Sequence, residues 1–402
     1  AIEYTPNVFS EAIIKNNNIK QQGVSPVKVF ALNANDNIFD NIGDNISPDI
    51  GKFTGIEIGS LPDIGYTLKK KAYYLNPNNG LRGTINVNAG CCVKMPMSNL
   101  SLIGTINFNG TEEENVIVTN INDDGISEIN PQKSSGNFLC SKSSVLRANY
   151  TKIRSSMTYI QGDGDIFFDH VEYDENLRGT IRICSGSNKT ISIKNSKIIR
   201  VEIDSEVNKN IEILNNVIYA GSSYGIQLNY SDTYADNLKR IHNNIIKGTN
   251  YPIYVNMNYH IVTIDGKYFN EMSNNHNYEV PDKDYIYIGK NWNSRYYISG
   301  KFPKNNYYIY TDSVTDVCEF EKGTKLTLKI EEGFVFSGDL ILNGTEEEPI
   351  EILNTSLISY GTIIANNVKF ISSGIKSYSS LYMINSDMGS EKNGTLNISD
   401  VK

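Results

Sequence analysis

The sequence is poor in the residues on which several protein classes depend. Hydrophobic residues make up 39% of its 402 residues and charged residues 20%, below the roughly 45–50% and 25% of typical globular domains. No stretch approaches the roughly 18 apolar residues of a membrane helix. The first twenty residues carry Glu3, Glu11 and Lys15 where a secretion signal needs an apolar run. We therefore expect no membrane insertion, and we expect any targeting signal or anchor to lie outside this sequence.

Cysteine and positive charge are also scarce. The five cysteines are odd in number and spread over hundreds of residues, which fits neither a disulfide framework nor a CxxC metal site. We expect buried thiols at Cys91, Cys92, Cys140, Cys184 and Cys318. The net charge is −8, with 37 basic and 45 acidic residues, and no Lys/Arg cluster could follow a phosphate backbone. Nucleic acid is therefore excluded as an expected partner.

Asn, Ser, Thr, Gly and Tyr take the place of the missing hydrophobic and charged residues. They follow a repeated pattern. Alternating apolar residues, a polar pair built on Asn and a further apolar residue recur in "TISIKNSKII" (190–199), "NIEILNNVIY" (210–219) and "KRIHNNIIKG" (239–248). Period-2 alternation predicts short strands, and Asn tolerates the left-handed backbone that a tight turn requires. Stacked coils of about twenty residues would bury their apolar faces against one another, with Asn ladders at the turns. We predict an all-β solenoid; the alternative is a β-sandwich with Asn-rich loops.

A larger repeat runs through the chain. "NGTEEENVIV" (109–118) returns as "NGTEEEPIEI" (343–352), 234 residues later, and Tyr73-Tyr74-Leu75 matches Tyr307-Tyr308-Ile309 at the same offset. "GIEIG" (55–59) matches "YIYIG" (285–289) at an offset of 230, and Pro26 and Val29 match Pro252 and Val255 at 226. Because the matches keep their order, small insertions in surface loops explain the drift.

These offsets predict three segments of one continuous solenoid. Residues 1–50 would end one repeat copy, residues 51–280 would form a complete copy, and residues 281–402 would begin a third. We expect the chain to be a piece of a longer array. The alternative is a complete protein with degenerate capping coils.

Two segments carry a family resemblance. "GTINVNAGCCVKMPMSNLSLIGTINFNGTEEENVIVTN" (83–120) and "GTKLTLKIEEGFVFSGDLILNGTEEEPIEILNTS" (323–356) resemble the opening coils of bacterial right-handed parallel β-helix proteins in the pectin-lyase-like style. The resemblance implies an all-β, right-handed parallel β-helix in an extracellular or cell-surface protein. It is weak for function, because the same coil occurs in lyases, hydrolases, tailspikes and adhesins.

The densest polar cluster is "QGDGDIFFDHVEYDENLRG" (161–179). If the chain is an enzyme, its candidate catalytic residues are Asp163, Asp165, Asp169 and His170, as a carboxylate pair for glycoside hydrolysis or as ligands of Ca²⁺ for polysaccharide lysis. Strand alternation places Phe168 with His170 on one face and Asp169 on the other. Against catalysis, neither Arg178 nor any other basic residue there is persuasively placed, and an Asp-His pair on an exposed strand is common in inactive β-helices.

The duplicated blocks share no acid/base constellation, because the corresponding stretch 365–389 lacks the Asp-His pair. We therefore predict a non-enzymatic cell-surface repeat module, a stalk or an adhesin, whose long face binds carbohydrate or a host or cell-surface protein. One alternative is a polysaccharide lyase, a hydrolase or a tailspike-like depolymerase. A second is a subunit of a surface filament that self-associates. No cofactor is predicted. The 26 tyrosines could stack on sugars, although tyrosine is also common in strands, and structural use is favoured for the tyrosine-rich segment 285–310.

Overall fold

The structure is a computed structural model of the chain. It describes residues 2–5, 12–18, 27–30, 36–43, 56–60, 65–70, 72–75, 80–96, 99–120, 138–154, 159–162, 164–175, 179–184, 190–204, 210–221, 224–230, 239–257, 261–278, 284–290, 295–310, 316–328, 334–389 and 396–398. Its contacts divide into two compact units: residues 1–201 with 212–219, and residues 202–211 with 220–402.

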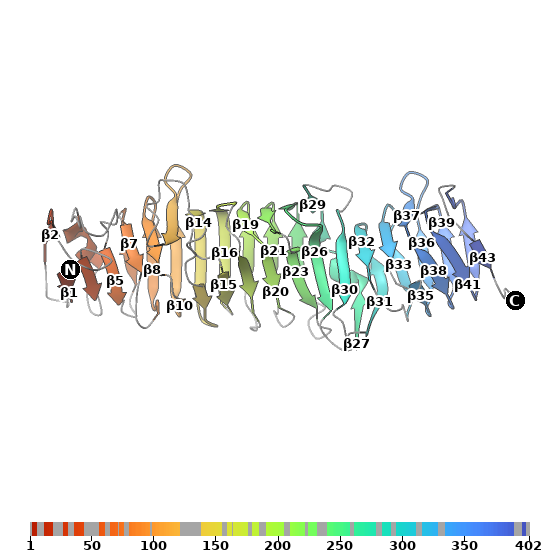
Figure 1. Cartoon of the computed structure of the whole chain (residues 1–402), viewed down its shortest axis with the longest axis horizontal. Coiled ribbons are helices and arrows are strands. Elements are labelled where there is room, and N and C mark those ends of the chain that lie inside the picture. Colours follow the sequence, from red (N-terminus) through yellow and green to blue (C-terminus); the bar gives the residue numbers. More distant parts are fainter. Residues whose placement is uncertain are drawn as a thin grey trace. The chain divides into compact units, whose positions relative to one another are not determined.

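The first unit is a stack of parallel strands (Figure 1). Its strands are β1 (Ile2–Tyr4), β2 (Ile14–Lys15), β3 (Val27–Phe30), β4 (Ile42–Gly43), β5 (Ile56–Ser60), β6 (Tyr66–Leu68), β7 (Ala72–Leu75), β8 (Thr84–Asn88), β9 (Cys92–Met95), β10 (Leu100–Leu102), β11 (Thr105–Asn109), β12 (Val116–Asn120), β13 (Phe138–Cys140), β14 (Val145–Ile153), β15 (Tyr159–Gly162), β16 (Asp165–Tyr173), β17 (Thr180–Ile183), β18 (Ile191–Lys194), β19 (Lys197–Ile199), β21 (Ile211–Leu214) and β22 (Val217–Tyr219). A 3-10 helix, η1 (Asp36–Asn41), precedes β4. β20 (Val201–Ile203) lies where the two units divide.

The second unit repeats this plan. Its strands are β23 (Tyr224–Tyr230), β24 (Lys239–His242), β25 (Ile245–Lys247), β26 (Tyr251–Met257), β27 (Ile261–Asp265), β28 (Met272–Ser273), β29 (His276–Asn277), β30 (Ile286–Lys290), β31 (Arg295–Phe302), β32 (Asn306–Ile309), β33 (Cys318–Phe320), β34 (Lys325–Leu328), β35 (Phe334–Phe336), β36 (Leu340–Asn343), β37 (Ile350–Leu353), β38 (Ser356–Ser359), β39 (Ile363–Asn366), β40 (Val368–Ile371), β41 (Gly374–Ser377), β42 (Leu381–Ile384) and β43 (Leu396–Ile398), with the 3-10 helix η3 (Gly266–Phe269). The fold prediction is confirmed: the chain is all-β and forms a parallel β-helix. Among the described residues, no helix is both long and apolar enough to cross a bilayer.

Buried side chains stack from coil to coil. In the first unit the parallel register places Ile85, Ile106, Leu146, Ile166 and Ile191 in one column, and each is 0% exposed. One strand with alternating residues cannot dehydrate its inner face, but neighbouring coils do so for one another. The alternation read from the sequence therefore becomes a continuous apolar core.

The Asn pairs form the corners of the coils, as predicted. Asn195 and Asn215 take left-handed φ values of 49° and 58°, which Asn adopts at lower cost than most residues. The Asn215 side-chain amide donates to the side-chain oxygen of Asn195 at 3.3 Å. Inside the corner, the Asn216 side chain accepts from the Ser196 backbone N–H at 3.0 Å and donates to the Ile193 carbonyl at 2.9 Å. The ladder thus satisfies backbone groups that the turn would otherwise leave unpaired.

All five cysteines are free thiols. Cys91, Cys140 and Cys318 are buried, whereas Cys92 and Cys184 are partly exposed. The prediction of buried thiols is therefore confirmed for three of the five.

Contacts recur at the offset of the long repeat. The Tyr73 hydroxyl donates to the Lys69 carbonyl at 3.0 Å, and 234 residues later the Tyr307 hydroxyl donates to the Pro303 carbonyl at 2.9 Å. The acidic turns repeat as well, since Lys70 pairs with Glu114 in the first unit. In the second unit the corresponding residues Lys304 and Glu348 form the same pair. The sequence repeat is therefore a repeat of three-dimensional contacts, while the boundaries of the copies stay a prediction.

An aromatic cluster recurs in the same way. Phe39 of η1 packs edge-on against Tyr73 with ring centroids 5.8 Å apart. Phe269 of η3 packs edge-on against Tyr307 at 5.5 Å. Both 3-10 helices therefore place a phenylalanine against a tyrosine whose hydroxyl donates to the carbonyl four residues before it.

Lys239 of β24 is buried in the second unit, with 6% of its surface exposed. Its ammonium lies 4.5 Å from the centroid of the Tyr268 ring, and burial lowers its pKa to about 8 from the ordinary 10.5. Because the folded-state pKa is the lower one, the charged form destabilises the fold at neutral pH. That cost fades as the pH rises from about 8 through 10.5.

Lys239→Met is therefore expected to stabilise the protein at pH 7. The gain should be about 2 kcal/mol, since a shift of this size costs about 3 kcal/mol and the lost contact with the Tyr268 ring offsets about 1 kcal/mol. Urea unfolding at pH 7 and pH 10 measures it, and the gain should shrink strongly at pH 10. An equal gain at both pH values would contradict the buried charge.

Candidate binding face

The polar cluster at 161–179 serves the stacking of coils. Asp165 accepts a hydrogen bond from the Thr190 backbone N–H at 2.8 Å. The Asp169 carboxylate accepts from the Asn195 side chain at 2.9 Å and lies 2.9 Å from Nδ1 of His170. Asp163 lies outside the described residues. Each described member is thus engaged with a neighbour, and the predicted catalytic roles remain predictions.

The prediction that side chains alternate strictly along β16 is wrong at His170. His170 has a left-handed φ of 53°, so the chain turns there. Strict alternation holds only along an extended strand; after the turn, Phe168 and Val171 both point inward and are each 1% exposed. His170 points outward and stacks on Tyr150 of the preceding coil, with ring centroids 4.5 Å apart. It occupies the corner position that Asn195 fills one coil later.

In the part of the chain that the structure describes, no three His, Cys, Asp or Glu side chains come together in a way that could hold a metal ion. The acidic turns are tied to lysines instead. Glu348 accepts hydrogen bonds from Lys304 and Lys322, which lower the pKa of its carboxyl to about 2. The turn is therefore an ion-pair cluster, and a role for Ca²⁺ elsewhere stays a prediction.

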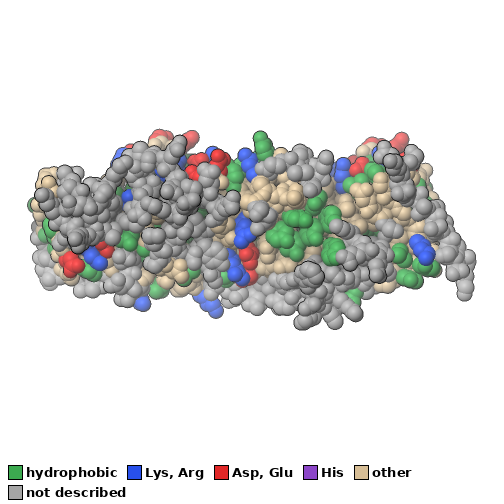
Figure 2. Space-filling model, viewed as in Figure 1, with side chains coloured by type: hydrophobic (Ala, Val, Ile, Leu, Met, Phe, Trp, Pro, Cys, Tyr) green, Lys and Arg blue, Asp and Glu red, His purple; other side chains and the backbone are tan. Residues whose placement is uncertain are grey.

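The second unit carries an aromatic surface that we call the tyrosine face. Six tyrosines on and beside β23, β26, β30 and β32 form it: Tyr224, Tyr251, Tyr254, Tyr285, Tyr287 and Tyr308. Figure 2 shows a green patch over β26 and β30. Tyr251 is 37% exposed, whereas Tyr254 at 8% supports the rings around it. Aromatic side chains grouped on a surface in this way mark interaction sites more often than scattered ones do.

The rings touch from strand to strand. Tyr224 and Tyr254 are stacked with centroids 4.0 Å apart and planes at 14°. Tyr254 and Tyr287 are 5.2 Å apart, and Tyr287 and Tyr308 are 5.1 Å apart. Tyr251 stands edge-on to Tyr287 at 5.0 Å. The spacings of 5.0, 5.2 and 5.1 Å are those of favourable aromatic pairs, so contacts within the protein already hold the face together.

The face is polar but uncharged. Burial, followed by the neighbouring hydroxyls of Tyr251 and Tyr308, raises the pKa of Tyr285 to about 12. The same causes raise the pKa of Tyr287 above its ordinary value, so the hydroxyls stay protonated at physiological pH. Among the described residues, none hydrogen-bonds the hydroxyls of Tyr251, Tyr285 and Tyr287. They are available to a ligand.

A row of amides follows the same strands. The Asn256 side chain donates to the side-chain oxygen of Asn229 at 3.0 Å, and the Gln227 amide donates to the same oxygen at 3.0 Å. The Tyr254 hydroxyl donates to the side-chain oxygen of Asn256 at 3.3 Å, which joins this amide row to the tyrosine face. Rings beside amides present both apolar planes and directional hydrogen-bonding groups, the combination found in sites for neutral polar ligands.

The first unit shows that the fold does not require the rings of Tyr254 and Tyr287. Tyr254 and Tyr287 lie opposite each other, and at the repeat offsets of 226 and 230 their counterparts are Lys28 and Glu57. Those two residues also lie opposite each other and form an ion pair at 3.1 Å. The same pair of strands is thus stable with opposite charges in the first unit and with tyrosines in the second. At these two positions the rings occur in the second unit, whereas Tyr308 has a tyrosine, Tyr74, as its counterpart in the first unit.

A glycine makes room for the large side chains in both copies. A Cβ on Gly289 would lie 2.7 Å from the Tyr254 ring, and a Cβ on Gly59 would lie 2.8 Å from Cε of Lys28. Both distances are too short for carbon atoms in contact. Glycine is therefore required at Gly289, beside the rigid Tyr254 ring, whereas at Gly59 the close atom is the end of the flexible Lys28 side chain, which can move.

Sequence reasoning found only part of this face. It singled out the tyrosine-rich segment 285–310 but favoured a structural use. It missed Tyr224, Tyr251 and Tyr254 because they belong to other coils. The signal was present in the repeat itself, since the alignment of the copies pairs Lys28 with Tyr254 and so exposes an exchange of charge for an aromatic ring.

No protein family, curated protein or solved structure is significantly similar to this chain.

Proposed function

We propose that the chain is a non-enzymatic repeat module of a bacterial extracellular or cell-surface protein, and that its tyrosine face binds a neutral polysaccharide. One observation carries the ligand proposal: aromatic rings replace an ion pair at the same position of the repeat. The parallel β-helix supports the module as a stiff carrier, because stacking pairs the strand edges along its length. The bacterial, pectin-lyase-like origin rests on the resemblance of its coil motifs.

The chemistry of the face favours sugar over protein. Pyranose rings offer C–H planes that pack on aromatic rings and hydroxyls that bond to amides and phenols. Protein partners are anchored mostly by aromatic and Arg side chains that fill pockets. On the tyrosine face the phenol hydroxyls are uncharged, and the adjoining amides of Gln227 and Asn256 are joined through Asn229 in a row. A neutral glycan chain matches this surface best.

Affinity electrophoresis tests the proposal. The protein is run through gels that contain dextran, mannan, β-glucan or galactan, with polygalacturonate as the anionic comparison. At least one neutral polymer is expected to retard the protein, and Tyr251→Ala should weaken binding about 3- to 10-fold because it removes one exposed ring.

Tyr360→Ala is the matched control. Tyr360 is 58% exposed and stacks on Tyr378 at 4.9 Å, but it follows β38 and has no contact with the tyrosine face. This variant should bind as the wild type does. The proposal is wrong if no neutral polymer retards the protein, if both variants lose binding equally, or if only protein ligands bind.

A further inference from the structure

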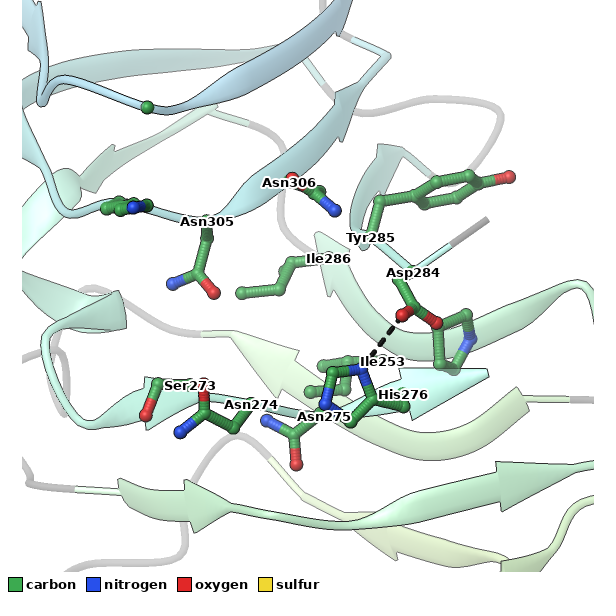
Figure 3. Close-up of a pocket in the computed structure, with 13 residues that line it drawn as sticks. Ile253, Ser273, Asn274, Asn275, His276, Asp284, Tyr285, Ile286, Asn305 and Asn306 are labelled. Carbon is green, nitrogen blue, oxygen red and sulfur yellow. Dashed lines mark hydrogen bonds and ion pairs between the residues drawn. The ribbon is translucent and has the colours of Figure 1, made fainter. Parts of the chain in front are cut away.

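We propose that a pocket beside the tyrosine face is a binding site for a single neutral pyranose ring. The pocket lies in the second unit and has a volume of about 220 Å³. It is built from the starts of β26, β30 and β32 and from the turn between β28 and β29 (Figure 3). The further claim that this pyranose is the chain end or a branch of a bound glycan rests on the proposed function.

The pocket lies where the series of left-handed corner asparagines is interrupted. The inner column of asparagines continues into the next coil: Asn275 donates to the Ile241 carbonyl at 2.8 Å, and Asn305 donates to the Met272 carbonyl at 2.7 Å. The residue before Asn275 is Asn274, a left-handed corner with φ of 52°. The residue before Asn305 is Lys304, whose ammonium pairs with Glu348. The left-handed asparagine corner at Asn274 is therefore not continued at Lys304 of the next coil, and the pocket lies beside Asn274.

Two amides face this space without a protein partner. Among the described residues, none hydrogen-bonds the side chains of Asn274 and Asn306, and Figure 3 shows them on opposite sides of the pocket. Ile253 and Ile286 supply apolar surface. Each amide offers both donors and an acceptor, so the pair suits hydroxyl groups around a ring whose C–H groups pack on the isoleucines.

The charged groups of the pocket are matched within the protein. Nδ1 of His276 lies 2.9 Å from Asp284, and the other Asp284 oxygen accepts from the Asn277 backbone N–H. Lys304 is held by Glu348. An ionic ligand would have to compete with these pairs, whereas a neutral one leaves them intact. The ligand class is therefore a neutral sugar.

The volume of the pocket suits one sugar ring. A volume of about 220 Å³ falls below the roughly 300–1,000 Å³ of sites for drug-sized ligands. This volume suits a single pyranose ring. Tyr285 belongs to both the pocket lining and the tyrosine face, so a glycan over the rings can place one residue in the pocket.

Saturation-transfer NMR with methyl pyranosides of glucose, galactose, mannose and N-acetylglucosamine tests the site. The wild-type protein should transfer saturation to at least one of them. The double variant Asn274→Gly with Asn306→Ala removes both amides, and glycine keeps the left-handed corner accessible. We expect the signal to fall at least 5-fold, and affinity for the polysaccharide to fall about 10-fold without vanishing.

Asn243→Gly is the control, because Asn243 has the same left-handed corner with φ of 56° but does not line the pocket. It should keep both signals. The inference is overturned if no pyranoside contacts the wild type or if the double variant keeps the signal. Retardation by a neutral polysaccharide without pyranoside binding overturns the pocket alone, whereas pyranoside binding without retardation overturns the proposed function alone.

Discussion

Replacing Tyr254 with Lys and Tyr287 with Glu is expected to weaken polysaccharide binding about 10- to 100-fold while the protein stays folded. The loss follows from the removal of two stacked rings, each contributing about 0.5–1.5 kcal/mol, and from the loss of support for Tyr224 and Tyr251. Affinity electrophoresis measures the effect. The fold should tolerate the exchange because Lys28 and Glu57 form an ion pair at this repeat position in the first unit.

The control is the double variant Tyr254→Phe with Tyr287→Phe, which keeps the rings and removes their hydroxyls. It should lose less binding than the Lys/Glu exchange, since the aromatic surface persists. Circular dichroism and the thermal midpoint confirm folding. If the Lys/Glu exchange binds as the wild type does, the tyrosine face is not the binding site.

Tyr307→Ala is expected to cost the most stability of any single change considered, about 3–5 kcal/mol. The side chain is 1% exposed, and its ring meets Phe302 edge-on with centroids 5.5 Å apart. Removing it leaves a cavity among rings and leaves the Pro303 carbonyl without its hydrogen-bond donor. Urea unfolding gives the free energy directly.

Two comparisons make the test specific. Tyr307→Phe removes only the hydroxyl and should cost about 1 kcal/mol. Tyr308→Ala changes the neighbouring residue, which points outward into the tyrosine face, and should cost clearly less than Tyr307→Ala. Equal costs for Tyr307→Ala and Tyr308→Ala would contradict the inward direction of Tyr307.

The fold could be predicted because its physics is local and repeated. An alternating strand followed by Asn195 or Asn215 specifies both a buried face and a left-handed corner. The same pattern recurs in successive coils. Prediction failed at His170, where a residue other than Asn occupies the corner. Nothing in the letters "FFDHVEY" marks the turn, so the strand looked continuous. The structure shows the corner at His170, which stacks on Tyr150, while the adjacent Asp169 accepts a hydrogen bond from Asn195.

The site was less predictable because it joins residues from different coils. Tyr224 and Tyr254 are 30 positions apart in the sequence, and only the parallel register of β23 and β26 brings them together. The pocket could not be predicted from the sequence. It lies where Lys304, paired with Glu348, stands in place of a left-handed corner asparagine, and no composition or motif marks a space that is left unfilled.

The most direct measurement is a crystal structure of the chain with an oligosaccharide from the neutral polymer that retards it most. We predict sugar rings packed on Tyr251 and Tyr285, with hydroxyls bonded to the amide row and one terminal or branch residue beside Asn274 and Asn306. Sugar bound along the polar cluster at 161–179, or on any surface without these tyrosines, would contradict the account.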